Sequence, residues 1–287
     1  MKRLEHCNLC KSSNKIDLFF KNNIPIVKCP QCGLVYADID IAVEEKLTEI
    51  YNHDYFFGKE YLNYIDDKEA LQKNFRKIIP LIKQYSNGGE LLEIGSAYGF
   101  FLELAKKYWN VTGIEISEEA CAYNAKEQSD VNIICGDFLT LHLKENFYDV
   151  VCMWGTMEHI ADPFSCIMKI NRALKKGGIF CFTTCDIDSP LPKIQGKKWR
   201  WFYPPSHLFY YSVSTLRKFL NANNFDMIEI RKIGIYRSLD LILYTVFYLN
   251  KNPFLQKLYF IIKKLKPVDI LYLNTFDTVF VIGRKIK

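Results

Sequence analysis

The sequence predicts an α/β protein with a doubly wound, mostly parallel sheet of seven strands and a small cysteine ribbon at the N-terminus. From residue 90 onward, short apolar runs alternate with segments of helical length. Such alternation implies right-handed crossovers, which build a parallel sheet with helices on both faces. Two Cys-x-x-Cys motifs precede this region. The expected strands are residues 91–94, 111–116, 131–135, 148–154, 178–184, 225–233 and 278–282, and the expected helices are 100–108, 118–128, 163–174 and 213–220.

Composition limits the class of protein. A chain of 287 residues is long enough for one large domain or two small ones with a real core. The net charge of +6 is mild and the basic residues are scattered, so nucleic acid is permitted but not indicated. We find neither the apolar stretch of a secretory signal nor an apolar run long enough to span a bilayer. We therefore expect a cytoplasmic protein with reduced cysteines. The sequence does not determine its oligomeric state.

The N-terminal cysteines have the spacing of a metal site. Cys7 and Cys10 form one Cys-x-x-Cys pair, and Cys29 and Cys32 form the second, which Gly33 closes. Four thiolates at this spacing are typical of a tetrahedral zinc site without an open position, which is therefore structural. The other cysteines lie in apolar segments without such pairing, and we expect small core residues. They are Cys121, Cys135, Cys152, Cys166, Cys181 and Cys185.

We expect three regions along the chain. Residues 1–37 form the zinc ribbon, residues 38–87 a helical and aromatic linker and lid, and residues 88–287 the sheet domain. The linker could cover a ligand pocket, or it could join the ribbon to the core as a packed aromatic seam, which is the commoner use of buried aromatic rings. Its apolar residues are Ile50, Tyr51, Tyr55, Phe56, Phe57, Tyr61, Tyr64 and Ile65, followed by a helical pattern at Leu71, Phe75, Ile78, Ile79 and Ile82.

A strand, a tight turn and a helix meet at residues 90–101. Glu93 lies near the end of the apolar run, and Gly95, Ser96 and Gly99 are small residues of the turn. Glycines allow positive φ there and let a ligand approach the backbone, while the following helix directs free N–H groups at it. Many parallel α/β units turn on glycine without a ligand, so this stretch alone does not decide the function.

The next two strands end in acidic residues. Glu115 and Ile116 lie about twenty residues past the glycine turn, where a carboxylate can accept both hydroxyls of a ribose. Asp137 follows the third strand and can accept an exocyclic amine, beside Phe138, whose ring can cover a purine. Either carboxylate could instead serve a helix N-terminus. Because they occur at successive strand ends, they favour an adenosine site.

Six motifs follow one another in a familiar order. They are Glu93-x-Gly95-x-x-x-Gly99, Gly113-Ile-Glu115-Ile-Ser117, Gly136-Asp137, Phe147-Tyr-Asp149-Val-Val, Met157-Glu-His159-Ile-x-Asp162-Pro163 and Leu174-Lys-Lys-Gly177-Gly178. Across residues 88–184 they resemble the motifs of class I S-adenosylmethionine-dependent methyltransferases. With the ribbon and the segment 199–216, the chain most resembles the zinc-ribbon branch, whose members often act on sugars, lipid-linked glycans or secondary metabolites. The resemblance implies a Rossmann-like methyltransferase fold with an antiparallel hairpin at the sheet edge.

The resemblance also implies roles for single residues. The glycine turn would hold the methionine end of S-adenosylmethionine through Glu93, Gly95, Ser96 and Gly99. The end of the second strand would hold the ribose through Glu115 and Ile116. The end of the third strand would hold the adenine through Asp137 and Phe138.

Three residues near the turn refine the expected donor. Gly95 and Gly99 are four apart and do not form Gly-x-Gly-x-x-Gly, which favours the methyl donor over NAD. Ala97 stands where the superfamily usually has glycine. We expect the added methyl group to reduce the conformational freedom of the turn without abolishing binding of the donor. Trp154 ends the fourth strand and could face the sulfonium cation, or it could be a core residue.

Two histidines lie in loops expected to face the methyl acceptor. His159 follows the fourth strand, and His207 lies in the segment after the fifth. Methyl transfer from a sulfonium needs mainly alignment and desolvation, with a base only when the acceptor must lose a proton. Both histidines are candidate general bases because histidine titrates near neutrality. His159 could instead fix the loop before the helix that Asp162 and Pro163 begin.

Residues 186–211 are expected to form the acceptor wall. The segment is long and contains five prolines or glycines among its aromatic residues, and loops of this length usually have a task. Its rings could stack on a sugar or another ring, and Arg200 could hold an anionic group.

A helical insertion is expected at residues 236–270, between the last two strands. Residues 239–249 are strongly apolar, and residues 254–265 mix apolar residues with lysines. Such a segment could contact an anionic membrane through residues 239–266, or it could pack on the core or on a second subunit.

Three functions are consistent with these patterns. The first is methyl transfer from S-adenosylmethionine to a small molecule, most simply a sugar, nucleotide-sugar, glycan or related metabolite. The second is RNA methylation, which the lack of a dense basic face disfavours. The third is a non-catalytic protein that keeps the donor fold and uses the ribbon to hold a partner, against which both acidic adenosine positions argue.

Overall fold

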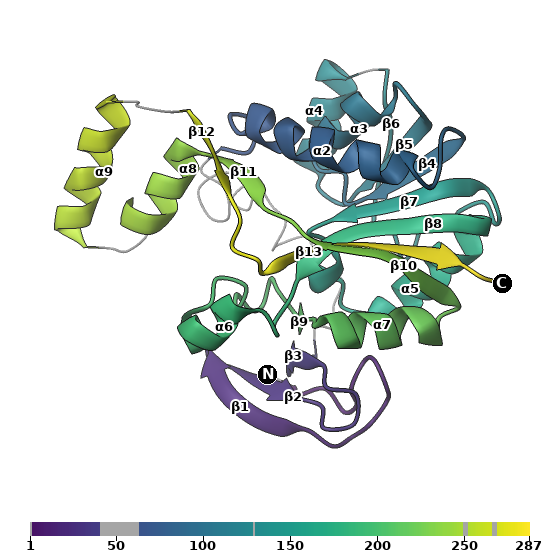
Figure 1. The fold of residues 1–287 in the computed structure, drawn as a ribbon, viewed down its shortest axis with the longest axis horizontal. Helices are drawn as coiled ribbons and strands as arrows, with labels where there is room; N and C mark the ends of the chain where they lie inside the picture. The colour runs from purple at the N-terminus through teal and green to yellow at the C-terminus, as the bar shows by residue number, and fades with distance from the viewer. Residues whose placement is uncertain (1, 41–62, 129, 249–251, 266–268) are drawn as a thin grey trace.

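The structure is a computed structural model that describes residues 2–40, 63–128, 130–248, 252–265 and 269–287. Its centre is a seven-stranded sheet in the order β10-β13-β8-β7-β4-β5-β6 (Figure 1). β13 runs antiparallel to both neighbours, and the remaining pairs are parallel. The predicted fold class is confirmed. The strands are β4 (Glu90–Ile94), β5 (Asn110–Glu115), β6 (Asn132–Cys135), β7 (Tyr148–Trp154), β8 (Leu174–Cys185), β10 (Phe225–Lys232) and β13 (Thr278–Lys285).

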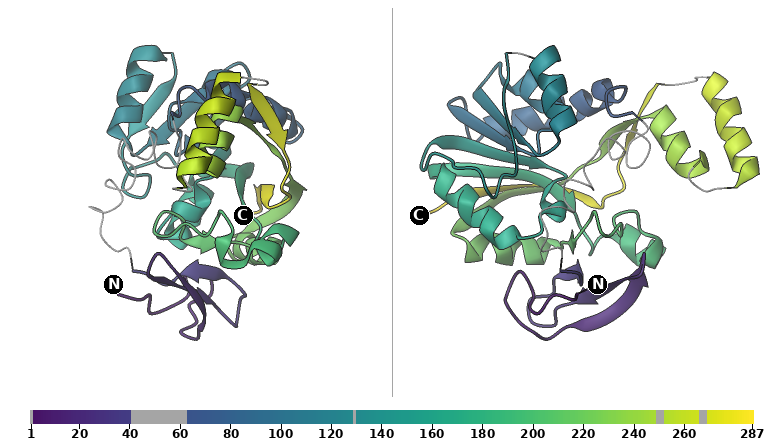
Figure 2. Two further views of the ribbon diagram at one scale, coloured as in Figure 1. Left: turned by 90° about the vertical axis from the view of Figure 1, so that its left-hand side faces the viewer. Right: turned by 180° about the vertical axis from the view of Figure 1, so that it is seen from behind.

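Helices cover both faces of this sheet (Figures 1 and 2). One face carries α2 (Lys68–Lys83), α3 (Phe100–Ala105) and α4 (Glu118–Glu127), and the other carries α5 (Pro163–Ala173) and α7 (Val213–Ala222). Successive side chains of a strand point to opposite faces. Leu91 therefore packs with α2 and α3, whereas Leu92 packs with α5 and α7, and both are fully buried.

Local capping sets where the helices begin. The Ser117 hydroxyl accepts the Ala120 N–H at 3.4 Å at the start of α4. Asp162 accepts the Ser165 N–H at 3.0 Å before α5, and Pro163 occupies the first turn, where its missing N–H costs nothing. The helix and strand limits lie close to the predicted ones, although α3 ends three residues earlier than expected and β8 begins four residues earlier.

The N-terminal ribbon is joined to the main domain by a shared sheet. β1 (Ile16–Lys21), β2 (Ile24–Lys28) and β3 (Val35–Ala37) are antiparallel, and β9 (Phe209–Tyr210) adds a fourth strand beside β3. Val35 pairs with Tyr210, and Tyr36 pairs with Phe209. The residues of β3 and β9 belong to the same apolar core as α5 and α7. The ribbon therefore lies against the segment predicted to form the acceptor wall.

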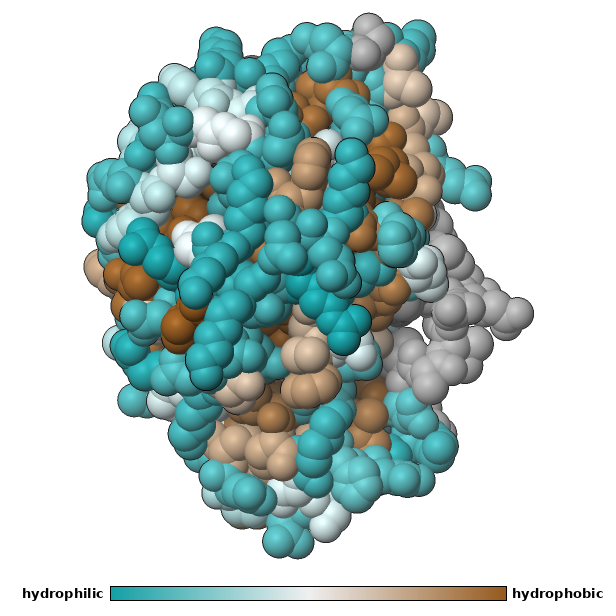
Figure 3. All heavy atoms as spheres, turned by 90° about the vertical axis from the view of Figure 1, so that its right-hand side faces the viewer, coloured by the Kyte–Doolittle hydropathy of each residue, from teal (hydrophilic) through white to brown (hydrophobic). Residues whose placement is uncertain are grey.

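The insertion extends away from the sheet, at the left of Figure 1. β11 (Ile235–Ser238) and β12 (Ile270–Leu273) form its antiparallel stem, which carries α8 (Leu239–Leu243), the π-helical turn η4 (Tyr244–Tyr248) and α9 (Pro253–Leu265). None of the helices in the described residues is long and apolar enough to cross a membrane. On the opposite side of the molecule, Figure 3 shows hydrophilic side chains that separate small apolar areas.

The linker is described only from residue 63. The aromatic residues predicted for it between Ile50 and Tyr61 lie outside the described residues. Tyr64 stacks on Tyr98 and Phe100, with ring centroids 5.4 and 5.6 Å away. This part of the linker is therefore a packed aromatic contact with the start of α3.

The expectation that the six remaining cysteines are unpaired is wrong for two of them. Cys121 and Cys135 form a disulfide between α4 and the end of β6. α4 leads into β6 as the crossover of a βαβ unit, so these two segments are adjacent although no Cys-x-x-Cys spacing links them. The other four are buried core residues, as expected: Cys152, Cys166, Cys181 and Cys185.

Candidate active site

The glycine turn links β4 to α3 at the carboxyl edge of the sheet. Gly95, Ala97 and Gly99 all have positive φ, at 72°, 45° and 68°. The N–H groups of Gly95 and Ser96 both donate to the Ile114 carbonyl, at 2.9 and 3.1 Å, and so tie the turn to the end of β5. Ala97 adopts the left-handed conformation despite its methyl group, and its effect on donor binding stays a prediction.

Two amide side chains, one in α4 and one at its C-cap, support the turn, and the sequence analysis missed both. Asn124 Nδ2 donates to the Ala97 carbonyl at 2.7 Å, and Gln128 Nε2 donates to the Tyr98 carbonyl at 2.9 Å. A Cβ at Gly99 would lie 2.6 Å from Asn124 Oδ1 and 2.9 Å from Gln128 Oε1. The sequence did contain a pattern that could have identified these two residues. They are amides four positions apart, which places both on the same side of a helix.

Two buried carboxylates lie beneath the turn. Glu93 Oε2 is buried without a hydrogen-bond partner. Burial and the nearby Glu115 raise the pKa of Glu93 well above its ordinary value. Glu115 accepts N–H groups from Ala97 at 2.7 Å and Ser117 at 2.8 Å, and burial raises its pKa against the effect of these bonds.

These groups match the needs of S-adenosylmethionine. A buried carboxylate oxygen without a partner is costly unless a donor reaches it. Glu93 can therefore take an ammonium group, and Ser96, whose buried hydroxyl also has no partner, lies three residues further on. The residues present thus fit the methionine end of the donor.

The predicted adenine residues follow β6. Asp137 Oδ1 accepts the Leu139 N–H at 2.9 Å, so it shapes its own turn, and its side chain is partly exposed. Phe138 is buried, with Lys169 Nζ 5.2 Å from its ring centroid. Ile116 is half-buried after β5. Contacts of these three residues with adenine stay a prediction.

Trp154 lies in an aromatic cluster under α2 and α3. Its ring centroid is 5.0 Å from that of Phe101, 6.3 Å from that of Phe75 and 6.3 Å from that of Phe280. Trp154 therefore packs with the core, which was the alternative to a position facing the sulfonium. Contact between Trp154 and the donor stays a prediction.

The two predicted histidines meet in space. His159 ends the 3-10 turn η2 (Met157–His159), and its ring centroid is 4.7 Å from that of His207, with the rings edge to face. His207 Nδ1 is 2.9 Å from the Trp201 carbonyl oxygen. The Leu208 N–H donates to the Glu158 carbonyl at 2.8 Å, which joins the two segments. Burial and the neighbouring His207 lower the pKa of His159 well below its ordinary value.

Glu158 completes this group, and the sequence analysis gave it no role. Its side chain is 1% exposed, and Oε2 accepts the Thr184 hydroxyl at 2.8 Å. The available signal was a carboxylate directly before His159, in the turn that follows β7. Such strand ends are where open α/β sheets place their ligands.

Thr156 connects the acceptor-side group to the glycine turn. A Cβ at Gly95 would lie 2.8 Å from Thr156 Cγ2, so glycine is needed for this close approach. Thr156 precedes η2 directly. Glu93, the turn and the two histidines therefore lie along the same edge of the sheet.

The predicted acceptor wall is more deeply packed than expected. Residues 190–198 form α6 (Pro190–Gln195) and the 3-10 turn η3 (Gly196–Lys198). Trp199 is fully buried and donates from Nε1 to Asp277 at 2.8 Å. Arg200 pairs with the same carboxylate at 2.9 Å and stays partly exposed, so its contact with an anion of the acceptor stays a prediction. The buried Asp277 requires a counter-charge, and Arg200 supplies it.

The four N-terminal cysteines come together as predicted. The Sγ atoms of Cys7 and Cys32 are 3.6 Å apart, those of Cys10 and Cys29 are 3.5 Å apart, and all four lie within 4.8 Å of one another. Neighbouring sulfurs of a tetrahedral site with Zn–S bonds of about 2.3 Å are about 3.8 Å apart. The cluster therefore fits a zinc ion. Gly33 has positive φ and donates to the Cys29 carbonyl at 2.9 Å, which closes the second turn.

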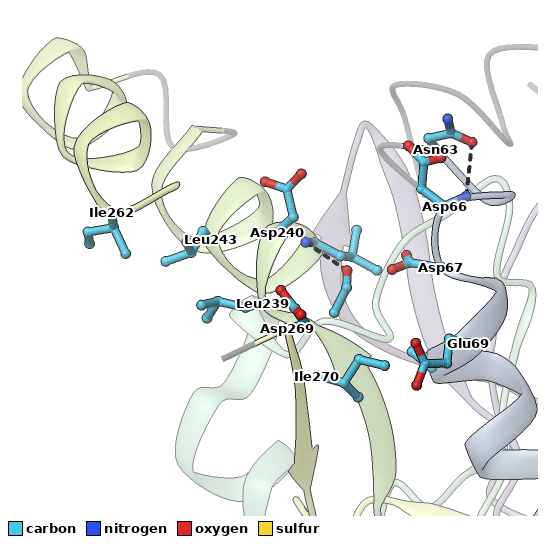
Figure 4. Close-up of a pocket in the computed structure, with 13 residues that line it drawn as sticks. Asn63, Asp66, Asp67, Glu69, Leu239, Asp240, Leu243, Ile262, Asp269 and Ile270 are labelled. Carbon is cyan, nitrogen blue, oxygen red and sulfur yellow. Dashed lines mark hydrogen bonds between the residues drawn. The ribbon is translucent and has the colours of Figure 1, made fainter. Parts of the chain in front are cut away.

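A carboxylate-lined cavity of about 360 Å³ lies between the start of α2 and the insertion. Figure 4 shows side chains near the start of α2 on one side and those of the insertion on the other. Burial raises the pKa of Asp67, one of its acidic residues. No motif in the sequence pointed to this cavity. Its acidic lining consists of Asp66, Asp67, Glu69, Asp240 and Asp269.

The sheet order, the left-handed turn and the buried carboxylates define a Rossmann-like protein of the class I methyltransferase type. A family model described as "Methyltransferase domain" matches residues 67–230, and the chain belongs to this family.

Curated relatives carry the name ubiquinone biosynthesis O-methyltransferase. One from Hydrogenovibrio crunogenus is 34% identical over 125 residues, which cover 40% of this chain and 51% of the relative. One from Pseudomonas fluorescens is 33% identical over 131 residues, which cover 41% and 56%. The chain thus spans about half the length of the curated relatives it matches.

Solved structures are similar in fold. YcgJ from Bacillus subtilis gives a TM-score of 0.55 at 14% identity, covering 75% of this chain and 99% of that chain. A SAM-dependent methyltransferase from Archaeoglobus fulgidus gives 0.53 at 18% identity, covering 81% and 100%. At these identities the likeness shows the fold alone.

Proposed function

We propose that the protein transfers a methyl group from S-adenosylmethionine to a small-molecule acceptor. The observation that carries this proposal is the buried, unpartnered Glu93 oxygen under a left-handed glycine turn, in a chain of the methyltransferase family. When bound, the donor supplies a methyl group on a sulfonium, which is already activated for displacement. The protein then has mainly to align the acceptor and exclude water.

Each predicted donor residue has a distinct task in this proposal. Glu93 accepts the ammonium group, while Gly95, Ser96 and Gly99 form the surface against the methionine end. Glu115 accepts the ribose hydroxyls beside Ile116, with the lone pairs that its two backbone N–H bonds leave open. Asp137 and Phe138 hold the adenine.

The acceptor is expected to present an oxygen atom. The relatives named ubiquinone biosynthesis O-methyltransferase support oxygen as the methylated atom and a quinone precursor as the first candidate. They give no support to the sugar or glycan expected from the sequence. We assign activation of this oxygen to His159 and His207, which lie on the same sheet edge as the donor turn.

The four N-terminal cysteines hold a structural zinc ion in this proposal, which places the chain in the zinc-ribbon branch. Support comes from the sulfur distances and from the fusion of the ribbon with β9, two residues after His207. The ribbon thereby positions the acceptor-side histidine rather than taking part in chemistry.

A two-stage experiment tests the function. Calorimetry with S-adenosylmethionine should show one donor per chain, and labelled donor should then pass its methyl group to one pool among quinone precursors, nucleotide sugars, glycolipids and RNA. A Glu93→Gln variant is the matched control for the donor site. Label in RNA would favour the second candidate function, and donor binding without any labelled acceptor the non-catalytic one. Absence of donor binding would overturn the proposal.

We also propose that the protein is cytoplasmic and touches membranes only peripherally, through residues 239–266. The support is that Phe254, Phe260 and Ile261 of α9 are exposed, beside the basic Lys257. An apolar surface with basic residues favours an anionic bilayer. Flotation with anionic and neutral vesicles tests this contact, and absence of binding to both would exclude it.

A further inference from the structure

A second cluster of metal-binding side chains lies on the acceptor side. Glu158, His159 and His207 each offer one ligand atom, and these atoms lie within 4.8 Å of one another. All three side chains are at least nine-tenths buried. Within the described part of the chain, this trio and the four N-terminal cysteines are the groups of three or more such residues.

The neighbours of the trio orient it for ligation. His207 Nδ1 lies 2.9 Å from the Trp201 carbonyl oxygen, which can only accept, so Nδ1 carries the proton and the lone pair belongs to Nε2. The Thr184 hydroxyl donates to Glu158 Oε2 at 2.8 Å. Hydrogen bonds of this kind hold the ligands of protein metal sites in orientation.

The chemical nature of the three side chains also suits a metal. Neutral imidazole is the form that binds metals. Two adjacent imidazoles with a carboxylate form a nitrogen and oxygen donor set that suits zinc and related divalent ions. Neighbouring ligands around zinc are about 3.3 Å apart. Side-chain shifts of about 1 Å would close the trio to this spacing.

We propose that Glu158, His159 and His207 bind a divalent transition-metal ion that activates the acceptor oxygen. The proposal rests on the proposed methyl transfer and specifies how the two histidines act, namely as ligands. Three protein ligands leave a coordination position open. Thr156, which directly precedes η2, lies against Gly95, so the trio and the glycine turn share this edge of the sheet.

The chemistry then balances without an oxidant or reductant. The acceptor hydroxyl loses its proton to water because the metal lowers its pKa. The oxygen forms a bond to the methyl carbon, the bond from carbon to sulfur breaks, and its electron pair stays on sulfur as a neutral thioether. No histidine has to take the proton.

Cobalt uptake by the full-length protein that carries one zinc ion per chain, in the ribbon, tests the site. Zinc in the ribbon blocks the thiolates, and any cobalt that displaced it would show a thiolate charge-transfer band that nitrogen and oxygen ligands do not give. We expect the wild type to bind one Co²⁺ with a visible spectrum free of that band. Glu158→Gln and His207→Ala should each weaken this uptake at least tenfold, and Thr184→Val about tenfold. His142→Ala, which removes an exposed histidine, is the matched control and should change nothing.

The outcomes separate this proposal from the proposed function. Glu158→Gln is nearly isosteric, so it remains informative if His207→Ala fails to fold. The metal site is overturned if the wild-type protein takes up no cobalt outside the thiolates. It is also overturned if the Glu158→Gln variant binds cobalt as tightly as the wild type. Methyl transfer that survives a chelator in such protein would leave the proposed function intact. A chain that binds cobalt but no S-adenosylmethionine would contradict the function and not the site.

Discussion

Replacing Glu93 with glutamine is expected to stabilise the ligand-free protein and to abolish donor binding. The Glu93 side chain is 2% exposed, and its Oε2 atom has no hydrogen-bond partner. A buried polar group without a partner costs about 1–3 kcal/mol. Glutamine has nearly the same shape and keeps a polar group, but it removes the buried charge and the repulsion from Glu115, so we expect the free energy of unfolding to rise by about 1–3 kcal/mol where Glu93 would be ionised. At about 2 °C per kcal/mol for a chain of this size, Tm should rise by about 2–6 °C.

The pH dependence gives this prediction a second signature. Burial and Glu115 raise the pKa of Glu93 well above its ordinary value of 4.5. The folded state then holds the proton more tightly than the unfolded chain, so this carboxyl favours folding at low pH, and its contribution is lost as pH rises through the folded pKa. Glutamine does not titrate. The Tm advantage of the variant should therefore be small near pH 4.5 and larger at neutral and alkaline pH.

Thermal unfolding with and without S-adenosylmethionine is the assay. Donor at about 100 times its Kd should stabilise the wild type by about 2.7 kcal/mol and leave the variant unchanged. Glu90→Gln is the matched control, because Glu90 lies on the same strand, is partly exposed and already accepts a hydrogen bond from Asn110 at 3.0 Å. A Glu93→Gln protein that is less stable than wild type at every pH, or that gains the same stability from the donor, would refute the reasoning.

Three further changes test other parts of the structure. Gly99→Ala should cost about 1–3 kcal/mol more than Gly177→Ala in urea unfolding, because both have positive φ but only Gly99 is crowded, by the side-chain oxygens of Asn124 and Gln128; equal losses would contradict this. Cys29→Ser should abolish zinc retention in metal analysis and expose residues 1–37 to protease, and a variant that keeps one zinc per chain would exclude the four-thiolate site. Arg200→Met should lower stability by about 2–3 kcal/mol in urea unfolding, less than the full cost of a broken buried pair because Arg200 is partly exposed. Weaker acceptor binding at unchanged stability would show that Arg200 serves the acceptor instead of Asp277.

Much of the sheet could be predicted because its signals are local. The apolar run before Gly95 and the runs that follow it have the length and spacing of strands and crossover helices, so neighbouring residues decide each element. The four thiolates were also predictable, since metal geometry restricts cysteine spacing. The same reasoning identified His159 and His207 as candidates from the loops in which they lie.

The rest depends on contacts between distant segments. β9 is two residues long, and its pairing with β3 leaves no periodic pattern in the sequence. The buried Asp277 pairs with the partly exposed Arg200, and nothing in the sequence around either residue predicts this ion pair. The disulfide between Cys121 and Cys135 was missed because spacing detects metal sites and not the approach of a helix to the next strand.

The pairing of β3 with β9 has a consequence for synthesis of the chain. β9 follows β3 by about 170 residues, so at about 5–20 residues per second the ribbon waits roughly 10–35 s with one strand edge uncovered. Uncovered edges invite pairing with other chains. Both cysteine pairs are complete by residue 32, so a zinc ion can hold the ribbon together during this wait. Zinc shortage during synthesis should therefore appear as aggregation of newly made chains, whereas finished protein, with β9 already in place, should tolerate the same shortage far better.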